Sequence, residues 1–132
     1  MENKRKHLEF IQLTITRMTV NSFFIKGWTI TLIAALFALS AKDANAHYLV
    51  IAFFPIPVFW LLDGFFLWQE RLFRALYDKV RIVDEHKIDY SMNTSHFVGG
   101  RNTWTRSVFS MTLNIFYGFL IFILILVIKF IS

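Results

Sequence analysis

The sequence contains no cysteine, which excludes disulfides and thiolate metal sites. Only two prolines and five glycines occur among 132 residues, so long stretches carry no helix breaker. Four histidines are present, but none forms an i, i+4 pair and none belongs to a known metal-ligand pattern. We therefore expect no metal site and no cofactor.

Motifs for catalysis are also missing. The sequence has no glycine-rich phosphate loop, no nucleophile elbow and no paired-carboxylate motif. The closest approach is "DEHKID", residues 84–89, which is more simply a solvated charged stretch at the end of a helix. We expect no catalytic residue and no enzymatic activity.

Apolar and aromatic residues are abundant instead. They make up 56% and 18% of the chain, with 16 Phe and a mean hydropathy of +0.51. A soluble domain is about 45–50% apolar, and a chain this short could not bury so much apolar surface. The net charge of +5 suits an anionic lipid surface or a nucleic acid. The composition predicts an integral membrane protein.

Three segments are long and apolar enough to cross a bilayer as helices. No alternating strand pattern recurs, so the predicted fold class is an all-α integral membrane protein, a single membrane domain over residues 1–132. The second helix should continue beyond the membrane to about residue 82, because nothing in "QERLFRALYDKVR" breaks it. The segment before the first span has helical apolar spacing, and we expect it to lie on the membrane or pack on a neighbour. The predicted parts are an amphipathic helix 4–19, span 1 at 20–41, span 2 at 47–68, a cytoplasmic helix and loop at 69–106, and span 3 at 107–131.

Basic residues predict the orientation. Four precede span 1 and seven lie between spans 2 and 3, whereas the turn between spans 1 and 2 and the C-terminus carry one each. Cytoplasmic loops carry the excess of Lys and Arg. The N-terminus should therefore lie in the cytoplasm and the C-terminus on the outer side of the membrane.

Two charges fall inside the predicted spans. Lys26 and Asp63 each lie six residues from the cytoplasmic end of their span, about 9 Å deep at 1.5 Å per residue. Charges inside a span are costly, so they usually pair or face water. One hypothesis is a pair that only fixes helix register; the other is that Asp63 borders a polar pore or gate.

Polar residues in the same halves of the spans bear on that choice. Ser107, Ser110, Asn114 and Tyr117 would share one face of span 3, and Ser22, Lys26 and Thr29 share one face of span 1. Hydrogen bonding between helices is a sufficient reason for the presence of any single one of these polar residues. Together they favour a hydrated vestibule, for which the candidate pore or gate residues are Asp63, Lys26, Ser110, Asn114 and Tyr117. Three helices cannot enclose a pore alone, so this hypothesis requires a homo-oligomer.

Two further features concern the second helix. Pro55 and Pro57 near the middle of span 2 predict a kink or broken turn, either passive or a gating hinge. Beyond the span, basic residues recur beside an apolar stripe. They can be a positive-inside anchor, or an oligomer could present them to an anionic ligand such as a nucleotide, nucleic acid or acidic lipid. The candidate ligand-binding residues are Arg71, Arg74, Lys79 and Arg81.

The stretches "KHLEFIQLTITRM", "NSFFIKGWTITLIAALFALSAKD" and "FWLLDGFFLWQERLFRALYDKVR" carry a resemblance. Over most of residues 6–81 the chain resembles small bacterial membrane proteins encoded beside anti-phage defence genes, and among them the transmembrane effectors of Hailong systems. The resemblance implies an oligomeric ion channel that acts by abortive infection. A short single-stranded DNA made by a partner nucleotidyltransferase would hold it inactive, and release would depolarise the inner membrane. It carries no ligand motif over to particular residues.

A second hypothesis belongs to a different class. The chain could be a non-conducting membrane anchor or scaffold that recruits a cytoplasmic enzyme through its 69–89 helix. A channel predicts depolarisation when the chain is expressed alone, whereas a scaffold predicts silent bilayers and a stable soluble partner. A carrier is disfavoured because three spans show no inverted repeat.

Overall fold

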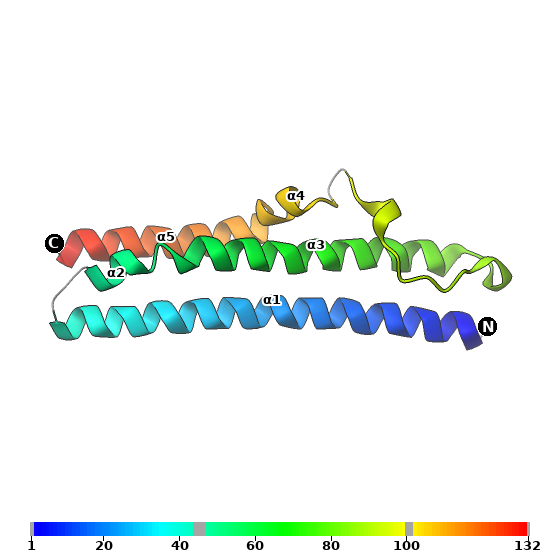
Figure 1. Ribbon diagram of the computed structural model, residues 1–132, viewed down its shortest axis with the longest axis horizontal. Coiled ribbons are helices and arrows are strands. Elements are labelled where there is room, and N and C mark those ends of the chain that lie inside the picture. Colours follow the sequence, from blue (N-terminus) through cyan, green and yellow to red (C-terminus); the bar gives the residue numbers. More distant parts are fainter. Residues whose placement is uncertain (1, 44–46, 100–101, 132) are drawn as a thin grey trace.

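The computed structural model describes residues 2–43, 47–99 and 102–131, and within these ranges it is helical and contains no strand. Three of the helices are long and run side by side, with the N- and C-termini at opposite ends (Figure 1). The elements are α1 (Glu2–Asp43), α2 (His47–Ile51), α3 (Pro55–Ile82), the short 3-10 turns η1 (Glu85–Lys87) and η2 (Ser95–Phe97), α4 (Trp104–Val108) and α5 (Met111–Ile131).

Three helical stretches are long and apolar enough to cross a membrane, the number of candidate spans that the sequence predicted. They are Glu2–Lys42, His47–Ile82 and Met111–Phe130. The first two are far longer than a bilayer requires. At 1.5 Å per residue the 42 residues of α1 extend about 63 Å, roughly twice the 30 Å of a bilayer core.

Helix α1 is continuous where the sequence suggested two parts. The predicted boundary between an amphipathic helix at 4–19 and a span at 20–41 is absent, because no breaker separates Thr19 from Val20. The amphipathic half packs on α3 through Ile11 and Ile15, both buried. Of the two placements left open by the sequence, packing on a neighbouring helix is therefore the one observed.

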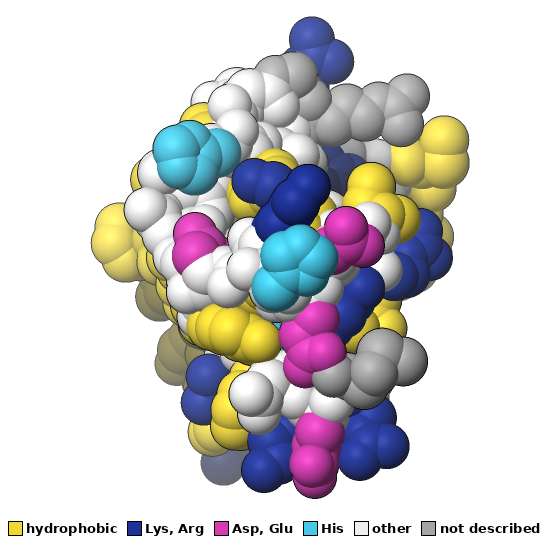
Figure 2. Space-filling model, turned by 90° about the vertical axis from the view of Figure 1, so that its right-hand side faces the viewer, with side chains coloured by type: hydrophobic (Ala, Val, Ile, Leu, Met, Phe, Trp, Pro, Cys, Tyr) yellow, Lys and Arg dark blue, Asp and Glu magenta, His cyan; other side chains and the backbone are white. Residues whose placement is uncertain are grey.

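Helix α3 ends at Ile82, which confirms the predicted extension of the second helix. Its last turns place Leu76 and Val80 against Ile11 and Ile15 of α1, forming one apolar cluster. This part of the molecule, residues 2–19 and 69–99, is called the charged end. Viewed end-on, it gathers Lys, Arg, Asp, Glu and His side chains (Figure 2).

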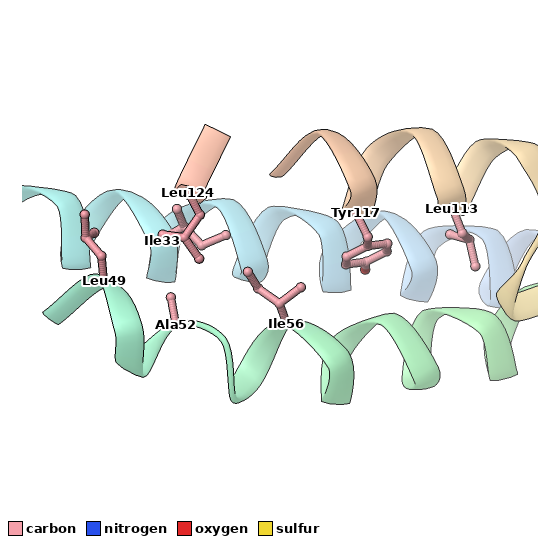
Figure 3. Packing of buried hydrophobic residues seen from close by; sticks show 7 residues of the cluster. All are labelled: Ile33, Leu49, Ala52, Ile56, Leu113, Tyr117 and Leu124. Atoms are coloured by element: carbon pink, nitrogen blue, oxygen red, sulfur yellow. The ribbon is translucent and has the colours of Figure 1, made fainter. Parts of the chain in front are cut away.

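A second apolar cluster lies between the three long helices. Side chains of α5 point toward α1 and toward the α2–α3 region (Figure 3). Its buried members are Ile33, Leu49, Ala52, Ile56, Leu113, Tyr117 and Leu124. Tyr117 is the one member with a polar group, and the next section shows where its hydroxyl goes.

The second span is broken where the two prolines predict a break. Helix α2 ends at Ile51, and Ala52, Phe53 and Phe54 form a tight turn with backbone bonds of 3.1 Å to the residues three positions earlier. Pro55 then begins α3, a position where its missing N–H costs nothing. The predicted kink at Pro55 and Pro57 is confirmed; whether it acts as a hinge stays a prediction.

The predicted third span is shorter than expected. It was expected from residue 107, but α4 ends at Val108 and α5 begins at Met111. The indole N–H of Trp60 donates a hydrogen bond to the Val108 carbonyl at 2.8 Å. The Ser110 hydroxyl accepts one from the Leu113 backbone N–H at 3.4 Å. These two side chains satisfy backbone groups at the break between α4 and α5.

The predicted loop over residues 90–103 is largely irregular, apart from η2. Gly99 has φ of +133°, a conformation that favours glycine, and two backbone hydrogen bonds of 3.3 and 2.8 Å pair it with Asn102. Gly100 and Arg101, which the sequence analysis counted in this loop, lie outside the described residues.

Candidate functional site

Asp63 lies in the interior between all three long helices. Its side chain is 0% exposed, and it accepts hydrogen bonds from two other helices. Its Oδ2 accepts from Lys26 Nζ at 2.7 Å and from the Tyr117 hydroxyl at 2.9 Å, while Oδ1 accepts from the Ser22 hydroxyl. We call Ser22, Lys26, Asp63 and Tyr117 the Asp63 cluster. It joins α1, α3 and α5 at one point.

Helix periodicity brings the α1 members together. Ser22 and Lys26 are four residues apart, so both face α3, and Lys26 Nζ donates to Ser22 Oγ at 2.8 Å. The Lys26 ammonium also lies 5.8 Å from the centroid of the Phe116 ring on α5, a cation–π distance. The Lys26 side chain is 21% exposed, so the cluster reaches the surface of the chain at this residue.

Aromatic side chains hold Tyr117 in place. Its ring is stacked on Trp60 of α3 at a centroid distance of 5.5 Å and an interplanar angle of 10°. Phe116 meets it edge-on at 4.8 Å. Trp60 is itself fixed by its bond to the Val108 carbonyl. The tyrosine hydroxyl is thereby directed at the carboxylate.

Gly64 allows α4 to come close to the cluster. A Cβ added at this buried glycine would lie 2.4 Å from Val108 Cγ2 and 2.9 Å from Val108 Cα. Such distances are below any normal contact, so only glycine permits this approach of backbones. The residue next to Asp63 thus sets how tightly α4 covers this part of α3.

The electrostatics of the cluster are nearly balanced. One carboxylate faces one ammonium, and two hydroxyls supply further donors to the carboxylate oxygens. A buried charge is tolerated when it is paired and its lone pairs are satisfied. Chemically the arrangement can fix helix register, or it can release a charged pair to water if the helices separate.

The predicted pore residues divide into two groups. Lys26, Asp63 and Tyr117 meet, whereas Ser110 and Asn114 do not join them. Ser110 caps the start of α5, and Asn114 is exposed, its amide donating to the Phe109 carbonyl at 2.9 Å. The expectation of one polar face from Ser107 to Tyr117 is wrong, because the break between α4 and α5 takes Ser107 and Ser110 off the α5 helix.

Two members of the site were not among the predicted residues. Ser22 appeared only as part of the α1 polar stripe, and Trp60 was not singled out. Trp60 precedes Asp63 by three positions, so helix spacing alone would have placed both on one face of α3. Thr29, the third member of the α1 stripe, is buried and donates to the Ile25 carbonyl at 2.7 Å.

The predicted anion-binding residues differ in their contacts, and whether they bind an anion stays a prediction. Arg71 is half-buried and donates to the Ser107 hydroxyl at 3.5 Å, and Arg74 pairs with Glu70 at 2.8 Å. Lys79 lies over the Phe97 ring at 5.8 Å, and Arg81 is exposed. The apolar stripe behind them packs against Ile11 and Ile15 of α1 in the same chain.

In the ranges 2–43, 47–99 and 102–131 no group of three or more His, Asp or Glu side chains could hold a metal ion. Comparisons with protein-family models, curated proteins and solved structures find no match. Fold and site together define a class: an all-helical protein with three candidate membrane spans and a buried, hydrogen-bonded ion pair between them.

Proposed function

We propose that this chain is the subunit of an oligomeric ion channel that serves as an effector of bacterial anti-phage defence. On activation it would depolarise the inner membrane and stop growth. An anionic ligand on the cytoplasmic side, a short single-stranded DNA made by a partner nucleotidyltransferase, would hold it inactive. The defence role, the nucleotidyltransferase and the DNA rest on the resemblance described above. The channel activity also rests on the chemistry of the Asp63 cluster.

The observation that carries the channel proposal is a fully buried carboxylate inside a candidate span. Asp63 is 0% exposed, and the side chain of its counter-ion Lys26 is 21% exposed. Ionisable groups within spans are rare and mark ion paths or gates more often than chance. A register pair alone needs no exposed partner. The partial exposure of Lys26 supports a cluster that can open.

Gating would separate helices that the cluster now joins. With Ser22, Lys26 and Tyr117 bound to Asp63, the charges neutralise one another in the closed arrangement. Moving α1 or α5 away would leave Asp63 and Lys26 facing the new gap, where water and ions solvate them. The turn at 52–54, between α2 and Pro55 at the start of α3, gives the second span a place to bend.

The orientation follows from charge. We place the charged end in the cytoplasm, because it carries nine of the 14 Lys and Arg residues of the chain. The termini at opposite ends of the molecule support an odd number of crossings (Figure 1). A ligand from the cytoplasm would therefore meet the part of α1 and α3 that extends beyond the membrane.

Planar-bilayer recording of the purified protein, with and without a single-stranded oligonucleotide, tests the proposal. We expect conductance without the oligonucleotide and reduced conductance with it. Asp63→Asn keeps the shape of the side chain and removes its charge, so it should assemble normally and conduct differently. Asp78→Asn makes the same change at an exposed carboxylate of α3 outside the Asp63 cluster, so it is the matched control and should conduct like the wild type. A silent bilayer under both conditions overturns the proposal.

The scaffold remains a second candidate because of apolar side chains at the charged end. Phe10, Leu13 and Ile82 are 61%, 64% and 77% exposed there, outside the part needed to cross a bilayer. A non-conducting anchor would use this surface or the 69–89 helix to recruit a cytoplasmic enzyme. It predicts silent bilayers and a stable soluble partner recovered with the full-length protein.

A further inference from the structure

An apolar groove lies beside α4, where α4 and the residue after it pack on α3. It consists of two adjoining hollows of about 190 and 240 Å³, which share Leu61, Val108 and Phe109 as lining residues. One hollow also reaches Trp104, and the other reaches Trp60. None of the lining residues belongs to the Asp63 cluster or to the candidate ligand-binding residues of the charged end.

The groove begins at the level where the second span ends. A bilayer core takes about 20 helical residues, which from the start of α2 reach about residue 66. Helix α4 is held over this part of α3 (Figure 1). The indole N–H of Trp104 donates to the Leu61 carbonyl at 3.0 Å, and that of Trp68 donates to the Asn102 carbonyl at 2.9 Å. Helix α4 therefore lies at the surface of the membrane, on the side of the charged end.

The two ends of the groove differ in their chemistry. The inner end is lined by Pro57, about nine residues inside the level of α4, which is about 14 Å at 1.5 Å per residue. The outer end is lined by Thr105 of α4, and Arg106 follows it in the chain. An occupant of this groove would have an apolar end inside the membrane and a polar end at the membrane surface.

Arg106 supplies a positive charge at the outer end. Its side chain is exposed, and within residues 2–43, 47–99 and 102–131 its guanidinium forms no ion pair and no hydrogen bond. The sequence has no Asp or Glu after Asp89, so α4 and α5 carry no carboxylate that would compete for this cation. Arginine pairs bidentately with phosphate, and its long stem lets the guanidinium reach the headgroups.

Tryptophan side chains form the walls at the same level. The rings of Trp68 and Trp104 are stacked at a centroid distance of 6.4 Å and an interplanar angle of 8°. Tryptophan is enriched at membrane–water interfaces, where its ring meets both acyl chains and headgroups. The indole N–H groups of Trp60, Trp68 and Trp104 are all bonded to carbonyls of the chain, so their rings offer apolar contacts.

We propose that this groove binds one acyl chain of an anionic phospholipid of the surrounding membrane, with the headgroup phosphate on Arg106. The position of the groove selects this occupant, because its apolar end lies inside a candidate span and its cation lies at the end of that span. The bound chain would contact Trp60, whose ring is stacked on Tyr117 of the Asp63 cluster. Binding depends on the membrane location of the candidate spans and not on channel activity.

Quenching of tryptophan fluorescence tests the assignment in the full-length protein. Trp28→Phe first removes the tryptophan of α1, which is 66% exposed, and keeps the three at the groove. The protein in neutral detergent is titrated with phosphatidylglycerol or phosphatidylcholine that carries bromine on its acyl chains. We expect phosphatidylglycerol to reach half-maximal quenching at about fivefold lower lipid content, the factor that one basic residue contributes at an anionic surface. Equal quenching by the two lipids overturns the assignment.

Two matched pairs of variants locate the headgroup and the acyl chain. Arg106→Gln should remove the preference for phosphatidylglycerol, whereas Arg17→Gln, at an exposed arginine of α1, should keep it. Phe109→Ala should weaken quenching by both lipids, because it removes a wall of the groove. Phe119→Ala is its control, since the two rings are 63% and 61% exposed and Phe119 lies outside the groove. Equal quenching curves within either pair overturn the assignment.

A helix of a second copy is the alternative occupant of the groove. The sequence has no cysteine, so Leu61→Cys places a single thiol at a lining residue that is 50% exposed. A disulfide-linked dimer in high yield after oxidation would show that another copy covers the groove, and it overturns the lipid assignment. Preferential quenching in a protein that does not conduct keeps this inference and overturns the channel. Conductance with equal quenching by the two lipids does the reverse.

Discussion

Lys26 and Asp63 are 37 positions apart in the chain, yet Lys26 Nζ lies 2.7 Å from Asp63 Oδ2. The pair joins α1 to α3, and the Tyr117 hydroxyl extends the contact to α5 through the same oxygen. A single carboxylate on α3 thus accepts hydrogen bonds from side chains of both other long helices. The predictions below separate the contribution of each contact to this arrangement.

Breaking the ion pair should destabilise the protein more than replacing it. Lys26→Met alone leaves a buried carboxylate without its counter-ion, which typically costs about 3–5 kcal/mol in a protein interior. The double variant Lys26→Met with Asp63→Leu removes both charges and should lie close to the wild type. Thermal unfolding in detergent, followed by tryptophan fluorescence, measures both. Equal destabilisation of the single and double variants would contradict this account.

Tyr117→Phe removes the third donor to Asp63 and keeps the ring that stacks on Trp60. A hydrogen bond to a charged group contributes about 1.5–3 kcal/mol, so we expect a loss of stability in that range. Tyr77→Phe is the control, because that half-buried tyrosine packs in the apolar cluster at the charged end. Unfolding midpoints that fall equally in the two variants would show that the Tyr117 hydroxyl contributes nothing special.

Gly64→Ala should disrupt the packing of α4 on α3. The new methyl group would meet Val108 Cγ2 at 2.4 Å and Val108 Cα at 2.9 Å, so the helices must move apart. Overpacking of this kind costs about 1–3 kcal/mol. Gly27→Ala is matched to it, since it lies in α1 with nothing within 4 Å of the added Cβ. That variant should be neutral or stabilised by about 0.5–1 kcal/mol, because alanine favours helix.

A changed environment at Val108 also gives a spectroscopic readout for Gly64→Ala. Trp60 donates to the Val108 carbonyl, so movement of α4 should shift the tryptophan emission. An emission spectrum and midpoint like those of Gly27→Ala would show that the close approach is absent in solution.

The packing of α1 on α3 at the charged end predicts a fourth result. Ile15 is 2% exposed and contacts the Leu76–Val80 side of α3, whereas Leu13 on the same helix is 64% exposed. Ile15→Ala should cost about 2–5 kcal/mol and speed hydrogen exchange in residues 2–19. Leu13→Ala should change the exchange little. Similar exchange in both variants would indicate that the first half of α1 does not pack on α3 in the membrane-bound protein.

The sequence by itself determined the helical class, the number of candidate spans and several boundaries. These follow from local rules: apolar length predicts spans, prolines predict the break before Pro55, and the lack of breakers predicts α3 reaching residue 82. The sequence also predicted that Lys26 and Asp63 lie at the same depth, because the rise per residue of a helix converts sequence position into depth. That reasoning places two charges at one level but cannot make them touch.

The tertiary structure decided which polar groups meet. Helix periodicity put Ser107, Ser110, Asn114 and Tyr117 on one face, yet only Tyr117 reaches Asp63. The reason lies in contacts between helices. Trp60 donates a hydrogen bond to the Val108 carbonyl, and Gly64 leaves room for Val108 against α3. The helix is interrupted between α4 and α5, next to these contacts. Likewise, Ile11 and Ile15 of α1 cover Leu76 and Val80 of α3, because both helices continue side by side beyond the length that a bilayer requires. Side-chain contacts across helices depend on distances that no periodicity encodes.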